Sequence, residues 1–302
     1  KDNGMETDQD KNVVKTGYLK EEFRLFHLKD KINLNYEFHY HEFNKIVIFL
    51  SGDVTYLIEG KPYKLQPWDI LLVSCNEVHR PVINPNVEYD RVVIWTNEHF
   101  LDKHSNEEFD LSACFKEAER LQKNLIRMEP AQIRETELLL DRLENAAKSG
   151  RPESHILRNA LFIQLLVHIN VLFSETRYDP EEDANTDSVV QSVVSYINRN
   201  IKKDLSIDSI ASNLYVSKYY LMHKFKERTG YTIYNYILQK RVLMANALIK
   251  KGMPIMQASY ECGFKDYSCF VRAFKKIYGT SPKMHFRQLK SENEPFEDKH
   301  YE

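Results

Sequence analysis

The chain has 302 residues, 42% hydrophobic and 28% charged, which is typical of a soluble globular protein. No apolar run reaches the roughly eighteen residues of a membrane span, and the polar first residues do not resemble a signal peptide. The four cysteines show neither CxxC pairs nor zinc-finger spacing. We therefore expect a cytoplasmic protein with reduced cysteines and no membrane contact.

The net charge of −2 is divided unevenly along the chain. Residues 1–188 carry a net charge of −11, whereas residues 189–290 carry 18 Lys and Arg against 5 Asp and Glu, a net charge of +13. Such a cationic block is typical of a module that binds phosphates, because a solvated surface alone would not sort charge in this way. The sequence predicts a nucleic-acid-binding domain near the C-terminus and a different task for the acidic part.

The acidic part begins with polar residues 1–16, which we expect to be disordered. Residues 17–105 contain short apolar runs that are bounded by turn signals such as Ser51-Gly52-Asp53 and Glu59-Gly60-Lys61-Pro62. This pattern predicts an all-β barrel or sandwich. The clearest predicted strands are 46–50, 54–58, 70–73 and 92–95.

Residues 106–175 have helical apolar spacing, with predicted helices over 107–125, 131–148 and 154–173. The third predicted helix is apolar on more than one face, so it has to bury more than the side that meets the barrel. A partner subunit is one candidate for the second contact, and burial within its own domain is the alternative. The acidic, proline-containing residues 176–188 are predicted to be a linker.

Residues 189–290 are predicted to be helical throughout and to contain an internal repeat. Positions Ile207 and Ala211 match Ile255 and Ser259 at an offset of 48, whereas Phe225 matches Phe274 at an offset of 49. The one-residue difference predicts a longer turn in the second copy. Each copy reads as a short helix, a turn and an amphipathic helix, which is typical of a helix-turn-helix that presents its second helix to DNA. Residues 291–302 form an acidic tail.

The second copy resembles the signature of AraC/XylS-type transcriptional regulators. The matching features are Ile255, Gly263-Phe264, Phe270 with Phe274-Lys275-Lys276, Gly279 and Ser281-Pro282. The earlier series His39-x-His41, Gly52, Gly60, Pro67-x-Asp69 and His79 resembles the cupin-type sensor of the same family, with Trp68 in place of the family's glycine. The resemblance implies an α+β multidomain fold: a cupin-like β-barrel, dimerisation helices, and an all-α domain with two helix-turn-helix motifs joined by a helix.

Residues that read bases are expected off the apolar stripe of each second helix and near its N-terminus. Arg272 is the best candidate for direct readout, because a guanidinium can bind guanine O6 and N7 together, and the family commonly has arginine there. His223 lies at the position where the first helix-turn-helix of this family often has arginine. Lys218 is among the expected base readers. Lys226, Lys275 and Lys276 are expected to contact phosphates or to be merely solvated. The predicted DNA-binding residues are Lys218, Tyr219, Met222, His223, Lys226, Tyr267, Ser268, Val271, Arg272, Lys275 and Lys276.

A pocket for a polar or anionic small molecule is expected inside the barrel. A cupin metal site usually adds a glutamate four residues after the second histidine, where this chain has Lys45, so we expect neither metal nor cofactor. Aromatic side chains there could stack on a sugar face. The predicted ligand-binding residues are His39, His41, Lys45, Tyr56, Trp68, His79, Arg80 and Trp95.

These observations predict a homodimeric, sequence-specific regulator of transcription, an activator that recruits RNA polymerase and is controlled by an effector such as a sugar. No nucleophile elbow, phosphate loop or paired-carboxylate motif indicates an enzyme. Two alternatives stay open: a regulator whose barrel serves only dimerisation or protein contact, and a metal-binding cupin.

Overall fold

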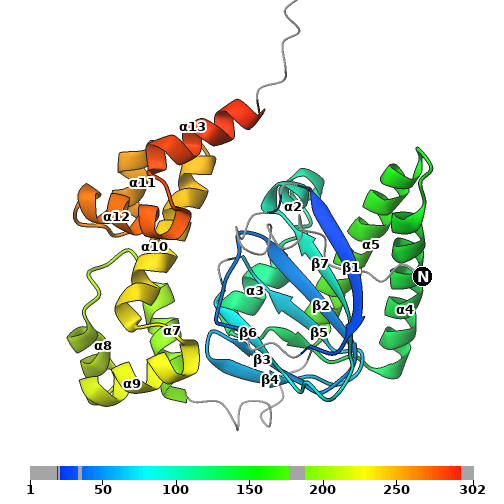
Figure 1. Cartoon of the computed structure of the whole chain (residues 1–302), viewed down its shortest axis with the longest axis horizontal. Coiled ribbons are helices and arrows are strands. Elements are labelled where there is room, and N and C mark those ends of the chain that lie inside the picture. Colours follow the sequence, from blue (N-terminus) through cyan, green and yellow to red (C-terminus); the bar gives the residue numbers. More distant parts are fainter. Residues whose placement is uncertain (1–18, 20, 33–35, 76, 177–187, 294–302) are drawn as a thin grey trace, which may run out of the picture. The chain divides into compact units, whose positions relative to one another are not determined.

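The computed structural model describes residues 19, 21–32, 36–75, 77–176 and 188–293 (Figure 1). They belong to two compact units, which divide between Gln191 and Ser192. The N-terminal unit is rich in β-strands, and the C-terminal unit is helical. The predicted disordered N-terminus (1–16), most of the predicted linker (176–188) and most of the acidic tail (291–302) lie outside the described residues.

The N-terminal unit contains two antiparallel sheets. One has the strand order β1-β7-β2-β5-β8, and the other has the order β4-β3-β6. The predicted strands coincide with β2, β3, β5 and β7, whereas Lys61-Pro62, predicted to be a turn, opens β4. The strand bounds are β1 (Phe23–Asp30), β2 (Asn44–Ser51), β3 (Val54–Ile58), β4 (Lys61–Lys64), β5 (Ile70–Val73), β6 (His79–Ile83), β7 (Tyr89–Thr96) and β8 (Leu125–Ile126).

Alternation along the strands separates two hydrophobic cores. Successive side chains point to opposite faces of a sheet, so Ile46 and Ile48 of β2 join the core on the outer face of the five-stranded sheet. Val47 and Phe49 join the core between the two sheets, where they pack with residues of β3 and β4. The same register directs Lys45 of β2 inward, directly opposite Trp95 of β7.

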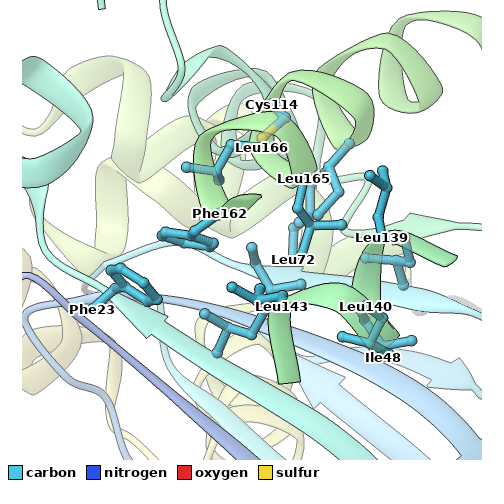
Figure 2. Close-up of a cluster of buried hydrophobic side chains, with 14 of the residues drawn as sticks. Phe23, Ile48, Leu72, Cys114, Leu139, Leu140, Leu143, Phe162, Leu165 and Leu166 are labelled. Carbon is cyan, nitrogen blue, oxygen red and sulfur yellow. The ribbon is translucent and has the colours of Figure 1, made fainter. Parts of the chain in front are cut away.

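Four helices follow β7 and cover the outer core. In Figure 2, Leu140 and Leu143 of one helix and Phe162 and Leu165 of the next lie over the sheet. All four side chains are nearly or fully buried. Each buried leucine or phenylalanine of this kind contributes roughly 1.5–3 kcal/mol of hydrophobic stabilisation. The helices are α2 (Glu98–His104), α3 (Ala113–Leu121), α4 (Pro130–Lys148) and α5 (Ser154–Glu175).

The predicted helix over 107–125 is wrong at both ends. Before α3, the Asn106 side chain accepts hydrogen bonds from the backbone N–H groups of Glu108 and Phe109, and these local turns compete with a helix. After α3, residues 125–126 form β8, which pairs with β5. The barrel and the helical region, predicted as separate domains, thus share one sheet and one core.

Helix α5 is long and apolar enough to cross a membrane by length and composition, although the sequence contains no uninterrupted apolar run of that size. In the structure it packs against α3 and α4. Leu161, Leu165, Leu166 and Ile169 are buried in the outer core. The helix therefore has the contacts of a core helix in this unit.

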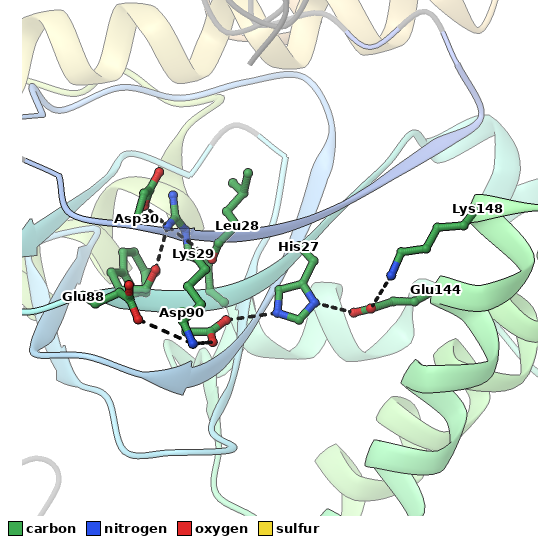
Figure 3. A network of polar contacts seen from close by, with 10 residues as sticks. His27, Leu28, Lys29, Asp30, Glu88, Asp90, Glu144 and Lys148 are labelled. Carbon is green, nitrogen blue, oxygen red and sulfur yellow. Dashed lines mark hydrogen bonds and ion pairs between the residues drawn. The ribbon is translucent and has the colours of Figure 1, made fainter. Parts of the chain in front are cut away.

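A polar network joins α4 to the sheet (Figure 3). The two ring nitrogens of His27 on β1 lie 3.0 Å from Oδ1 of Asp90 and 3.0 Å from Oε1 of Glu144. Lys29 pairs with Asp90, and Lys148 pairs with Glu144 within α4. The edge strand β1, its neighbour β7 and helix α4 are thus held together by polar contacts as well as by the hydrophobic core.

The C-terminal unit contains two similar helix pairs joined by a long helix. The first pair, α8 and α9, matches the second pair, α11 and α12, with offsets of 48 for the short helices and 49 for the long ones. Ser217 caps α9, and Asp266 caps α12. The bounds are α7 (Ser188–Asn200), α8 (Ile207–Asn213), α9 (Lys218–Thr229), α10 (Ile233–Lys250), α11 (Ile255–Glu261), α12 (Tyr267–Tyr278) and α13 (Pro282–Asn293).

The segment after α7 is enclosed by the second helix pair and α10. Arg241 of α10 donates hydrogen bonds to the carbonyls of Ile201 (2.9 Å) and Lys203 (2.6 Å). Gly263, in the α11–α12 turn, has φ +87°, and a Cβ there would lie 2.9 Å from the carbonyl oxygens of Ile201 and Lys202. The equivalent position in the first pair is Tyr215, which also has positive φ but is 96% exposed. Glycine is therefore required in the second turn by close packing.

Candidate ligand cavity and nucleic-acid interface

A cavity of about 270 Å³ lies between the two sheets of the N-terminal unit. This volume is slightly below the range of sites for drug-sized molecules. Its walls are mostly apolar and aromatic, with a few polar groups. The lining residues are Leu28, Ile32, Tyr36, Glu37, His39, Tyr40, His41, Phe43, Lys45, Tyr56, Pro81, Ile83, Tyr89, Arg91, Val93 and Trp95.

The structure places five of the eight predicted ligand-binding residues on the cavity wall: His39, His41, Lys45, Tyr56 and Trp95. The other three, Trp68, His79 and Arg80, are not among the lining residues. Trp68 keeps the turn in which the family has glycine by adopting φ +71°. Its side chain packs against the outer core, so it does not contribute to the cavity.

Several cavity residues were missed by the sequence analysis, including Tyr36, Tyr40, Tyr89, Arg91 and Val93. Two of them could have been found from Trp95, because Arg91 and Val93 lie two and four residues earlier on the same strand and face the same side. The guanidinium of Arg91 is buried and pairs with Asp30, and it also donates to the carbonyl of Tyr89 (2.9 Å). Its charge is therefore compensated within the protein.

Three histidines meet at one end of the inner face. His39 and His79 form an isolated β-bridge, and their ring centroids are 4.3 Å apart, while His41 and His79 are 4.8 Å apart. Each Nδ1 lies within 3.0 Å of a backbone carbonyl oxygen, those of Glu37, Phe43 and Glu77. A ring nitrogen beside a carbonyl has to carry the proton, so each neutral ring has its lone pair on Nε2.

Burial keeps these three histidines neutral. Desolvation, followed by the charge of Lys45, lowers the pKa of His39 to about 4. Desolvation and the same charge also hold the pKa of His41 well below its usual value of about 6.5. The pKa of His79 is lowered well below that value by desolvation and by the two other rings. Within the described residues, no group of three or more His, Cys, Asp or Glu is arranged to hold a metal ion.

Helix α9 places most of its predicted DNA-binding residues in solvent. Leu221 and Phe225 are buried, while Lys218, Met222, His223 and Lys226 are exposed. Tyr219 is 77% exposed, and its ring stacks beside that of His223 with a centroid distance of 6.4 Å. Lys218 pairs with Asp208 of α8 at 2.9 Å, which ties the start of α9 to the preceding helix.

Helix α12 exposes a more cationic face. Ser268, Arg272, Lys275 and Lys276 are exposed, opposite the buried Phe270 and Phe274. The other two predicted base readers, Tyr267 and Val271, are half-buried and pack against the hydrophobic core of this helix pair. The structure therefore leaves these two with less surface for contact than the sequence pattern indicated.

A row of exposed apolar residues runs along α5, away from the outer core. Ile156, Val167 and Val171 are 74%, 38% and 43% exposed. At 100° per residue they lie within a narrow sector of the helix, together with the exposed Ala160. We call these four residues the α5 stripe. Contiguous apolar surface of this kind is typical of an interaction site.

Comparison with known proteins agrees with this division of the chain. A family model described as an AraC-like ligand binding domain matches residues 26–166, and one described as a helix-turn-helix domain matches residues 210–288. The HTH-type transcriptional activator RhaS of Mannheimia succiniciproducens is 26% identical over 248 residues, which cover 81% of this chain and 87% of RhaS.

Two further matches are an uncharacterized regulator and a solved structure. An uncharacterized HTH-type transcriptional regulator in the cgkA 5′ region of Pseudoalteromonas carrageenovora is 34% identical over 120 residues, which cover 39% of this chain and 71% of that protein. The crystal structure of ToxT from Vibrio cholerae shares 17% identity with this chain, covering 89% of it and 99% of ToxT, with a TM-score of 0.35.

Proposed function

Because the chain belongs to the AraC family of DNA-binding transcriptional regulators, we propose that it is an activator whose N-terminal cavity holds a small-molecule effector. In this proposal the two facing sheets are a cupin-like sensor barrel. The pairs α8–α9 and α11–α12 are two helix-turn-helix motifs, and α10 is the helix that joins them. The protein acts in the cytoplasm as a regulator and has no enzymatic activity of its own.

The observation that carries the proposal is the repeated arrangement of α9 and α12. Each buries an aromatic and aliphatic stripe and leaves cationic and hydrogen-bonding side chains exposed beside a capped N-terminus. Two such helices suit two major-groove faces about 34 Å apart, which is one turn of DNA. Activation is proposed because the relatives RhaS and RhaR are named transcriptional activators, and contact with RNA polymerase would carry it out.

The DNA-binding part of the proposal predicts a steep dependence on salt. With a net charge of +13 over residues 189–290, the domain should neutralise several phosphates and release their counterions. We expect the affinity of the full chain for a selected duplex to fall by about a thousandfold or more between 50 and 200 mM salt. Fluorescence anisotropy of labelled DNA measures this dependence. A flat salt response would contradict a phosphate-binding role for the domain.

We propose that the α5 stripe forms the homodimer contact, since the buried side of the helix is already used by the core of its own unit. Val167→Lys should raise the dissociation constant of the dimer by about tenfold or more, because a charge would replace a central apolar contact. Analytical ultracentrifugation measures this constant. Leu121→Lys is the matched control, because Leu121 is an apolar residue, 51% exposed, at the end of α3 and outside the α5 stripe. Equal effects of both variants would place the interface elsewhere.

The alternative, a barrel that serves only dimerisation, would not require a cavity. The cavity and its polar lining favour a ligand, and a sugar is one candidate because Tyr56 and Trp95 can stack on its apolar face.

A further inference from the structure

We propose that the cavity recognises a small hydroxycarboxylate, an acid that also carries a hydroxyl group, in preference to a neutral sugar. This inference rests on the proposed role of the cavity as an effector site. It follows from three polar side chains on the wall, Lys45, Trp95 and His41, which lack a matching polar partner among the described residues.

The first requirement is a negative charge. Lys45 lies half-buried on the inner face of β2, and among the described residues it contacts the ring of Tyr56 at 5.8 Å but has no carboxylate within ion-pair distance. The other charged groups of the wall do not offset it. Arg91 is already paired with Asp30, and the side chain of Glu37 is exposed. The neighbouring histidines are neutral, because burial and Lys45 itself lower their pKa values.

Among the described lining residues, Lys45 is therefore a cation without a paired carboxylate, in mostly apolar surroundings. A monoanion is the complement of such a site, since a charge in a low-dielectric cavity is stabilised by an opposite charge within a few ångströms. A neutral sugar would leave that cation without a partner.

The second requirement is an acceptor beside Lys45. Trp95 is directly opposite Lys45 in the β2–β7 register, so the two side chains start roughly 5 Å apart on the same face. The Trp95 indole N–H is buried and has no hydrogen-bond partner in the part of the chain that the structure describes. An indole can only donate, so it needs an acceptor. A carboxylate, with two oxygens, can accept from both the Lys45 ammonium and the Trp95 indole.

The third requirement is a donor. The His41 Nδ1 lies 2.8 Å from the Phe43 carbonyl and carries the proton, so Nε2 presents a lone pair. This Nε2 atom is buried and finds no partner within the described ranges of the chain, and His41 itself is only 6% exposed. A carboxylate oxygen would be repelled by that lone pair, whereas a hydroxyl group would donate to it. The ligand thus needs a hydroxyl apart from its acid group.

The remaining lining residues determine the size and polarity of the rest of the ligand. Val93, Ile32 and Leu28 supply apolar surface, and Tyr36 and Tyr56 supply rings. The volume of about 270 Å³ admits a small molecule with one ring and excludes a drug-sized one. Both a sugar acid and an aromatic hydroxy acid satisfy this shared chemistry.

The test is calorimetric titration of the full-length protein with matched acids and amides. One arm uses galacturonate, galacturonamide and galactose, and the other uses 4-hydroxybenzoate, 4-hydroxybenzamide and benzoate. We expect at least one hydroxycarboxylate to bind about tenfold or more tightly than its amide, since a hydrogen bond to a charged group is worth more than a neutral one. The series in which binding occurs shows whether the ligand carries its acid and hydroxyl groups on a sugar or on an aromatic ring.

Three variants assign the contacts. Lys45→Met keeps the length of the side chain and should abolish the preference for acid over amide, while Lys64→Met, at an exposed lysine of β4, should leave it unchanged. Trp95→Phe keeps an aromatic ring without the indole N–H and should weaken the acid by severalfold. His41→Phe should abolish the preference for 4-hydroxybenzoate over benzoate. Circular dichroism would verify that all the variants fold.

Two results would overturn the inference: an amide or neutral sugar that binds as tightly as its acid, or no binding by any acid of either arm. In both cases the salt-dependent DNA binding of the same preparation is measured without ligand. Intact DNA binding would leave the proposed regulator standing while this effector class is rejected.

Discussion

Acidification from pH 7.5 to pH 5.5 is expected to lower the free energy of unfolding of the N-terminal unit by about 4 kcal/mol through His39, His41 and His79 together. Their folded-state pKa values are lowered, that of His39 to about 4. In this range the unfolded chain takes up protons near pH 6.5 while the folded unit does not. Stability is therefore fully present above the unfolded pKa and is lost as the pH falls from there toward the folded pKa values, with a comparable contribution from each histidine.

The two tryptophans of the chain, Trp68 and Trp95, both lie in the N-terminal unit. Urea unfolding followed by tryptophan fluorescence therefore reports this unit alone. His79→Asn retains a donor for the Glu77 carbonyl and removes one titrating group, so it should reduce the pH dependence by about a third. His155→Asn, at an exposed histidine of α5, is the control and should leave the dependence unchanged. Equal stability at the two pH values would show that the three rings take up protons in the folded protein as readily as in the unfolded chain.

Replacement of Arg272 by alanine is expected to weaken binding to the preferred DNA site by about 1–3 kcal/mol and to relax base preference at one position. Arg272 is exposed on the first half of α12, which is fixed by the buried Phe270 and Phe274. Because its side chain is not part of the core, the variant should fold normally. Selection of DNA from a random pool with the wild-type protein would supply the site, and anisotropy with single-base variants of that site measures the preference.

A second variant, Arg272→Lys, distinguishes base readout from phosphate contact. Lysine keeps the charge but lacks the planar fork that binds guanine O6 and N7 together. If Arg272 reads a base, the lysine variant restores affinity in part and the base preference hardly at all. Uniform weakening on every sequence, with lysine restoring it fully, would show that Arg272 contacts only a phosphate.

The sequence predicted the buried strands and missed the edges. All four strands that were individually predicted, β2, β3, β5 and β7, have a neighbour on both sides, whereas β1, β4, β6 and β8 lie at sheet edges. The interior strand β5 is buried on both faces and reads as a continuous apolar run. The edge strands β4 (KPYK) and β6 (HRPVI) carry polar residues and proline, and so resemble turns.

The helical unit was predicted more completely because its signals are local. Caps, glycines and apolar spacing lie within a few residues of the helix ends that they determine, and the repeat offsets of 48 and 49 were confirmed. The cavity depends on long-range pairing instead. Lys45 and Trp95 face each other only because β2 pairs with β7 across fifty residues, and no local pattern gives that register.

The packing of residues 201–203, which follow α7, affects how a displacement of α7 reaches the two helix pairs. Helix α7 follows directly on the predicted linker. The residues that come after it, 201–203, accept hydrogen bonds from Arg241 and pack against Gly263. The first helix pair has an open, exposed Tyr215 at the equivalent point. Tyr196 of α7 also accepts a hydrogen bond from the Asn213 side chain of α8 (3.1 Å), so α7 is joined to both helix pairs. A displacement of α7 should therefore move α8 and the turn before α12 together.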